Sequence, residues 1–83
     1  MEVDYDAELP PYLQVAADLR RRIASGELRP GARVPSITYI METYGIARNT
    51  ARRAVQVLTD EGLVVVRQGW GTFVRSDEAD DES

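Results

Sequence analysis

The stretch from Gly45 to Val74 limits the possible folds of this chain more than any other segment. It begins with a tight turn at Gly45-Ile46-Ala47 and continues as an amphipathic helix, expected over 48–61 with Gly62 as its stop. Two β-rich runs follow, at 63–67 and 72–75, and glycines in the loop between them permit the positive φ of a tight hairpin. A turn, a helix and a hairpin in this order are typical of a helix-turn-helix followed by a wing.

Two further helices are predicted before this turn. The first opens at Pro10-Pro11 and ends at Gly26. Its apolar positions recur with the spacing of one buried helical face, and they are Tyr12, Val15, Ala16, Leu19 and Ile23. The second spans 37–44, between an N-cap at Ser36 and a stop at Gly45.

The connection between these two helices is expected to be extended at Arg33-Val34-Pro35, because a residue before proline avoids helical geometry. Tyr12 and Tyr44 are expected in or beside the core. The predicted fold class is therefore α+β, mainly α: a winged helix-turn-helix with three helices and a C-terminal β-hairpin wing.

The composition excludes several classes of function. The 83 residues suffice for one small domain, and they include no cysteine and no histidine. Thiolate and histidine metal sites and histidine-based catalysis are therefore absent, and we expect no cofactor, no metal ion and no enzymatic activity. No signal peptide or membrane-length apolar run is visible, so a cytoplasmic location without membrane association is expected.

Charge is distributed unevenly along the chain. Residues 1–9 carry −4 and residues 76–83 carry −5, and both segments are expected to be flexible acidic tails. The domain between them, 10–75, holds all ten arginines against five acidic residues, a net charge of +5. Because local charge governs attraction to phosphate, this arrangement favours a nucleic-acid partner despite the overall charge of −4.

The start of the predicted third helix has the layout of a groove-reading helix. At about 100° per residue, one face of its first two turns gathers Arg48, Asn49, Arg52 and Arg53, and the apolar residues share the other. Arginine can pair with guanine and asparagine with adenine, while Thr50, between the faces, can contact a phosphate or a thymine methyl. Cations here oppose the helix dipole, and an external anion would offset that cost.

The hairpin and the second helix offer further contacts. Arg67, Gln68 and the Gly69 amide can reach a phosphate or the minor-groove edge. Trp70 has two interpretations: packing over the wing and the first helix, which we favour, or exposure at the tip against the sugar-phosphate backbone. Additional candidates flank the start of the second helix, whose free amides can bind a phosphate; they are Arg33, Ser36 and Thr38.

From Tyr12 to Val74 the sequence resembles the N-terminal DNA-binding domain of the GntR family of bacterial transcription regulators. The resemblance is carried by YLQVAADLRRRIASGELRPGARVPS, YGIARNTARRAVQVLTDEGLVVVR and GWGTFV, in this order. It implies a winged helix that binds pseudo-palindromic double-stranded DNA operators as a dimer. Most members of that family are repressors released by a small-molecule effector.

The resemblance also assigns roles to individual positions. Groove-reading positions of the family match Arg48, Asn49, Thr50 and Arg52, Ser36 matches its serine before the second helix, and Gly69 matches its wing tip. Thr38 stands where the family usually has a DNA-contacting arginine, and Ala47 stands where it usually has a serine cap. Arg53 is our candidate to compensate for the missing arginine.

The family's C-terminal effector domain has no counterpart in this sequence, so a small complete regulator and a fragment both remain open. Without it we expect no small-molecule effector site, and a homodimer at least on DNA. The predicted function is sequence-specific operator binding, as a repressor, with helix 48–61 in the major groove and wing 67–72 on the adjacent backbone or minor groove. The alternative is a winged-helix protein–protein adaptor without sequence-specific DNA binding.

Overall fold

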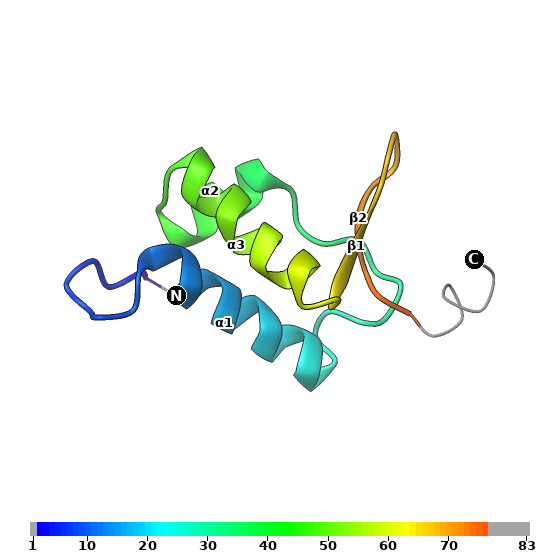
Figure 1. Cartoon of the computed structure of the whole chain (residues 1–83), viewed down its shortest axis with the longest axis horizontal. Coiled ribbons are helices and arrows are strands. Elements are labelled where there is room, and N and C mark those ends of the chain that lie inside the picture. Colours follow the sequence, from blue (N-terminus) through cyan, green and yellow to red (C-terminus); the bar gives the residue numbers. More distant parts are fainter. Residues whose placement is uncertain (1, 77–83) are drawn as a thin grey trace.

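The computed structural model describes residues 2–76 as three helices followed by a hairpin (Figure 1). The helices are α1 (Pro11–Ser25), α2 (Ile37–Tyr44) and α3 (Arg48–Asp60), and the strands are β1 (Val64–Arg67) and β2 (Gly71–Val74). This confirms the predicted winged helix-turn-helix. The acidic tail expected at 76–83 lies, apart from Ser76, outside the described residues. None of these three helices is long and apolar enough to cross a membrane.

The helix ends follow from local chemistry. The Ser36 hydroxyl accepts a 3.1 Å hydrogen bond from the Tyr39 amide and so caps α2, as predicted. Gly26 and Gly45 end α1 and α2 in the left-handed conformation, at φ 87° and 66°. The hairpin strands each begin one residue away from their predicted starts. The Leu63 amide still binds the Leu58 carbonyl at 3.0 Å, which keeps Leu63 in the helix end and out of the strand.

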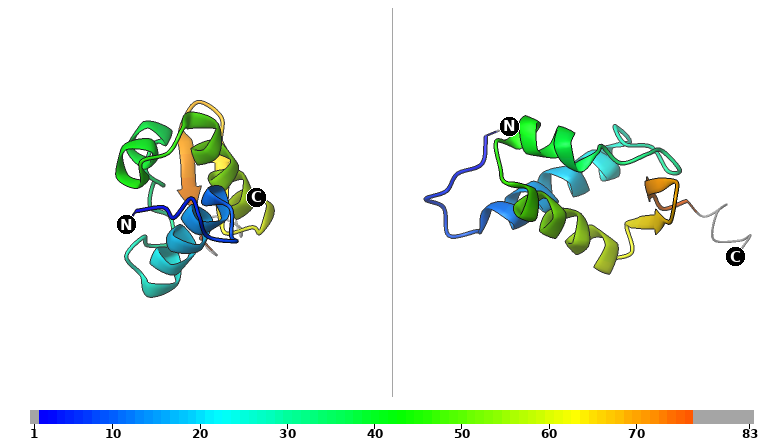
Figure 2. Two further views of the ribbon diagram at one scale, coloured as in Figure 1. Left: turned by 90° about the vertical axis from the view of Figure 1, so that its left-hand side faces the viewer. Right: turned by 90° about the horizontal axis from the view of Figure 1, so that it is seen from above.

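The core lies between α1, α3 and the base of the wing. Val15 and Leu19 of α1 meet Ala51, Ala54 and Leu58 of α3, and all five are at most 1% exposed. The alanines let α3 approach α1 along its length, and Figure 2 shows the two helices side by side. Ile40 and Tyr44 cover this core from α2, and Val64 and Val74 cover it from the hairpin. The burial of Tyr44 and the partial burial of Tyr12 confirm the predicted placement of both.

The connection before α2 forms an additional strand-like edge on the wing. The Val34 amide donates to the Thr72 carbonyl and the Val74 amide to the Ala32 carbonyl, each at 2.8 Å, and Arg33 pairs with Phe73 in an antiparallel bridge. The expectation of an extended segment at 33–35 is confirmed. Proline has no amide hydrogen to continue such pairing, so Pro35 separates this edge from α2.

Residues 2–9, expected as a flexible lead-in, make defined contacts in the structure. The Gln14 side chain donates to the Asp4 and Leu9 carbonyls at 2.7 Å, and accepts from the Asp4 amide at 2.9 Å. The Tyr5 hydroxyl donates to the Gly45 carbonyl at 3.0 Å. The lead-in therefore lies beside the turn between α2 and α3, at the opposite end of the molecule from the wing (Figure 1).

Candidate nucleic-acid interface

Helix α3 presents a polar face to solvent over its first two turns. Arg48, Asn49 and Arg52 are exposed, whereas Ala51 and Ala54 on the opposite side are completely buried. The buried side fixes α3 against α1, so the polar face points away from the core. The structure thus brings together three of the residues predicted on this helix, with Thr50 half-buried at their edge.

The arginines of this face lack acidic partners within the structure. Among residues 2–76, no carboxylate lies within ion-pair distance of Arg48 or Arg52. The arginines of α1 differ, because each has a carboxylate partner within the chain. Their ion pairs are Arg20–Glu61 at 2.7 Å, Arg21–Asp18 at 2.5 Å, Arg22–Asp18 at 3.2 Å and Arg22–Glu27 at 3.4 Å. The positive charge at the start of α3 is consequently available to an anion from outside.

The N-terminus of α3 adds to this positive potential. Ala47 occupies the N-cap position in an extended conformation and supplies no side-chain hydrogen bond. The first amides of a helix have no partner within it, and the helix dipole places a partial positive charge there. Arg48 and Asn49 follow directly, so main-chain and side-chain donors share the same exposed end.

Arg53 lies on the α1 side of α3. Its guanidinium stacks over the Tyr12 ring of α1, 3.9 Å from the ring centroid. At about 100° per residue, Arg48 and Arg52 lie on the other side of Asn49, nearer Val55. The structure therefore sets Arg53 apart from the two arginines that have no partner. Its planar group is held by an aromatic ring, while the residue as a whole remains exposed.

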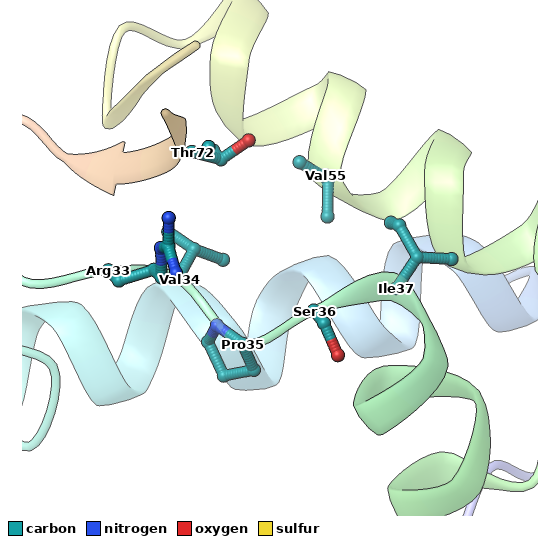
Figure 3. Close-up of a pocket in the computed structure, with 8 residues that line it drawn as sticks. Arg33, Val34, Pro35, Ser36, Ile37, Val55 and Thr72 are labelled. Atoms are coloured by element: carbon teal, nitrogen blue, oxygen red, sulfur yellow. The ribbon is translucent and has the colours of Figure 1, made fainter. Parts of the chain in front are cut away.

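A groove lies between residues 33–37 on one side and α3 and the wing on the other (Figure 3). It has a volume of about 250 Å³ and lies between the start of α2, Val55 of α3 and strand β2. Ser36 and Thr72 line this groove, with the Ser36 hydroxyl turned away from it toward α2, and Arg33 lies at its wing end. Thr38 is exposed in the first turn of α2. The start of α2, the middle of α3 and strand β2 thus border one groove.

Arg33 holds the wing, a role that the sequence analysis missed. Its guanidinium donates a hydrogen bond to the Trp70 carbonyl and lies over the Phe73 ring, 5.7 Å from the centroid. A Cβ atom at Gly71 would come within 3.1 Å of the Arg33 Nε, so a larger residue there would require the guanidinium to shift. The available signal in the sequence was Gly71, which was interpreted as a glycine of the hairpin turn.

The wing tip is exposed to solvent. Trp70 is 71% exposed, and Arg67, Gln68 and Gly69 are exposed beside it. The favoured interpretation, in which Trp70 packs over the wing and α1, is therefore wrong. The aromatic residue that packs on the wing is Phe73, which lies beneath both Arg33 and Arg67. Trp70 is left at the tip, where the turn carries it beyond the helices.

A buried polar cluster joins α1 to α2 behind the interface. Asp18 is 7% exposed, and it accepts hydrogen bonds from Tyr44 at 2.6 Å and from Arg21 at 2.5 Å. Burial alone would raise the pKa of Asp18, but these hydrogen bonds and the charge of Arg22 outweigh it and hold the pKa below its ordinary value. Burial and the bond to Asp18 raise the pKa of Tyr44. The i,i+3 and i,i+4 spacing of Asp18 with the two arginines is the signal of this cluster in the sequence.

Comparison with known sequences places the chain in a family. Residues 11–74 match the model of the gntR family of bacterial regulatory proteins. The chain is 38% identical over 74 residues to the HTH-type transcriptional repressor NagR of Bacillus subtilis, covering 89% of this chain and 30% of that protein. It is 44% identical over 68 residues to the histidine utilization repressor of Klebsiella aerogenes, covering 82% and 28%. The chain thus spans less than a third of the length of these two relatives.

Solved structures give the same result. The GntR-family transcription factor YtrA from Sulfolobus acidocaldarius superposes with a TM-score of 0.83 at 34% identity, over 93% of this chain and 66% of that one. The DNA-binding domain of AraR, crystallised in complex with operator ORX1, superposes with a TM-score of 0.79 at 33% identity, over 89% and 95%. The chain belongs to the GntR family of bacterial regulatory proteins, and residues 11–74 form the winged helix-turn-helix DNA-binding domain of that family, regulatory and not enzymatic.

Proposed function

We propose that this protein is a sequence-specific transcriptional repressor that places α3 in the major groove of an operator and its wing on the adjacent backbone or minor groove. The observation that carries this proposal is the exposed Arg48–Arg52 face, which has no acidic partner among the described residues. Phosphates and the acceptor edges of bases would supply the missing anion.

Each residue of α3 would have its own role. Arg52 and Arg48 would donate to guanine or to phosphate, and Asn49 would pair with the edge of an adenine. Thr50 would contact a phosphate or a thymine methyl group. Arg53, held by its stack on Tyr12, would present its remaining N–H groups to the backbone at the α1 edge of the surface.

The start of α2 and the wing would fix the register on the duplex. Ser36 and Thr38 lie where the first amides of α2 meet solvent, a suitable position for one phosphate. Arg67, Gln68 and the Gly69 amide would contact the backbone on the other side of α3. Arg33 would act mainly by holding the wing, since its guanidinium is already bound to the Trp70 carbonyl.

We further propose that two copies bind a pseudo-palindromic operator. Two-fold related winged helices place their reading helices about one DNA turn apart, roughly 34 Å or a multiple of it. The names of two relatives describe repressors, and the AraR domain was crystallised with an operator, which supports both the repressor role and the operator target.

Selection from a random duplex library, followed by sequencing, tests the proposal. Enrichment of a two-fold symmetric motif would support an operator-binding dimer and would give its half-site spacing. An asymmetric single site would contradict the dimer, and no enrichment at all would favour the adaptor alternative. A reporter gene with the enriched motif placed across its promoter would then test repression directly.

A further inference from the structure

Trp70 is the only tryptophan of the chain, and it lies in the turn between β1 and β2. It is the most exposed large apolar side chain of the described residues, at 71%. An indole ring left in water at the end of a hairpin contributes little to the stability of the fold, because most of its apolar surface remains hydrated. Its position therefore calls for a contact outside the chain.

The backbone beneath this ring is held firmly. The Trp70 amide donates to the Arg67 carbonyl at 2.9 Å across a turn in which Gly69 has a φ of 80°. The Trp70 carbonyl accepts from Arg33, whose own backbone is paired with β2. The ring thus projects from a fixed support, and little conformational entropy of the backbone would be lost when it binds.

The surroundings of the ring match a narrow anionic groove. Gly69 and Gly71 flank it, so no neighbouring side chain in the sequence widens the tip. Arg67 and Gln68 are exposed on the same turn and can donate to phosphates at the rim of a groove. The tip therefore combines one flat apolar ring with polar groups behind it.

We propose that Trp70 enters the DNA minor groove beside the site read by α3 and selects A·T-rich sequence there. This inference rests on the proposed function, because it requires the domain to bind DNA. The minor groove has walls of deoxyribose, against which the ring can pack, and apolar side chains inserted into it are a known way of contacting DNA. The guanine amino group projects from the floor of that groove at G·C pairs and would obstruct the ring.

The intrinsic fluorescence of Trp70 provides a direct test, since no other tryptophan contributes. Three duplex polymers serve as probes: poly(dA·dT), poly(dG·dC) and poly(dI·dC). Inosine lacks the minor-groove amino group of guanine but keeps its major-groove acceptors. Comparison of poly(dI·dC) with poly(dG·dC) therefore distinguishes contacts in the minor groove from contacts in the major groove. Binding to each polymer is measured independently by mobility shift at low salt, where non-specific affinity is greatest.

We expect the Trp70 emission to move to shorter wavelength, with protection from acrylamide quenching, on poly(dA·dT) and poly(dI·dC) but not on poly(dG·dC). Equal changes on all three polymers would place the ring on the backbone and overturn the inference. Unchanged emission on polymers that are bound would overturn it while leaving the proposed function intact. Failure to bind any polymer would contradict both.

Variants give a second, independent measurement. Trp70→Ala should lower the affinity for poly(dA·dT) about tenfold, because the packing of the ring against the groove walls is lost, and should change the affinity for poly(dG·dC) little. Trp70→Phe should retain most of the affinity. Leu9→Ala, which removes another exposed apolar side chain at the opposite end of the molecule, is the matched control and should have no effect. Equal losses on both polymers with Trp70→Ala would overturn the inference.

Discussion

Tyr44, the last residue of α2, donates a 2.6 Å hydrogen bond to the carboxylate of Asp18 in the middle of α1. The bond is buried, and Arg22 completes the contact, with its guanidinium 3.2 Å from the same carboxylate and 5.7 Å from the Tyr44 ring centroid. This cluster attaches α2, the first helix of the helix-turn-helix, to the rest of the domain. It therefore helps to set the angle at which α2 and the following turn present α3.

Removing the Tyr44 hydroxyl should destabilise the domain. Tyr44→Phe leaves Asp18 buried with one hydrogen bond fewer, and a bond to a charged group contributes about 1.5–3 kcal/mol. We expect a loss of about that size in the free energy of unfolding, measured by urea denaturation. Tyr39→Phe is the control, because Tyr39 is 53% exposed, and it should be neutral. Equal effects of the two variants would contradict a stabilising role for the Tyr44–Asp18 bond.

The same cluster should make stability depend on pH. The folded-state pKa of Asp18 lies below its ordinary value of 3.8, so its ionised form stabilises the fold at any pH above that value. This contribution should disappear as the pH falls below 3.8 and through the lower folded-state pKa. Urea denaturation at neutral pH and near pH 3 measures the difference. Asp18→Asn should be less stable at neutral pH, and its free energy of unfolding should decrease less on acidification. If the decrease is as large as in the unmodified protein, ionisation of Asp18 is not its cause.

The two wing glycines should differ in their tolerance of alanine. Both have positive φ, 80° at Gly69 and 126° at Gly71, so either change strains the backbone. Only at Gly71 would the new Cβ meet Arg33, at 3.1 Å, while Gly69 faces open space. Gly71→Ala should therefore weaken DNA binding more than Gly69→Ala does. In an Arg33→Ala background, Gly71→Ala should lower the DNA affinity by less than it does in the unmodified protein. If the losses of affinity from the two substitutions are strictly additive, the Gly71–Arg33 contact does not affect binding.

The missing cap of α3 can be restored. Ala47 already has the extended conformation of an N-cap, φ −73° and ψ 160°, and it is exposed. Ala47→Ser should therefore stabilise the domain by about 1 kcal/mol, the usual value of such a cap. Ser36→Ala, which removes the observed cap of α2, should destabilise it by a similar amount. Thermal unfolding of both variants tests these two expectations. If Ala47→Ser destabilises the domain, the first amides of α3 do not gain a hydrogen bond from a serine at this position.

Salt dependence should separate the unpartnered arginines from the paired ones. If Arg52 neutralises a phosphate, Arg52→Ala should weaken DNA binding and reduce the slope of log affinity against log salt by about 0.9. Arg20→Ala is the control, because Arg20 is already paired with Glu61 at 2.7 Å. Its slope should match that of the unmodified protein. A changed affinity with an unchanged slope would indicate that Arg52 contacts a base and no phosphate.

The order of elements could be predicted from this sequence because local signals coincide with their ends. Ser36, Gly45 and Gly26 mark helix boundaries by their own chemistry, and the apolar spacing of α1 matches the buried face that the structure shows. The exposed set Arg48, Asn49 and Arg52 could be predicted for the same reason, since helical periodicity alone separates it from the buried alanines.

Contacts between distant residues could not be predicted in this way. The Arg33–Trp70 and Asp18–Tyr44 pairs join residues 37 and 26 positions apart, and periodicity carries no information about such pairs. Trp70 was misplaced because a large apolar side chain is usually buried. In the structure the aromatic ring that contacts arginines on the wing is that of Phe73, which lies beside Arg33 and Arg67.

The pairing of residues 31–34 with β2 has a mechanical consequence. Pro35 alone separates Val34, whose amide binds the wing, from Ser36, which caps α2. The hairpin and the helix-turn-helix are therefore coupled rigidly through this connection. We expect a regulatory signal to rotate the whole domain as a rigid body relative to a second copy, because bending the wing alone would break the main-chain hydrogen bonds between residues 31–34 and β2.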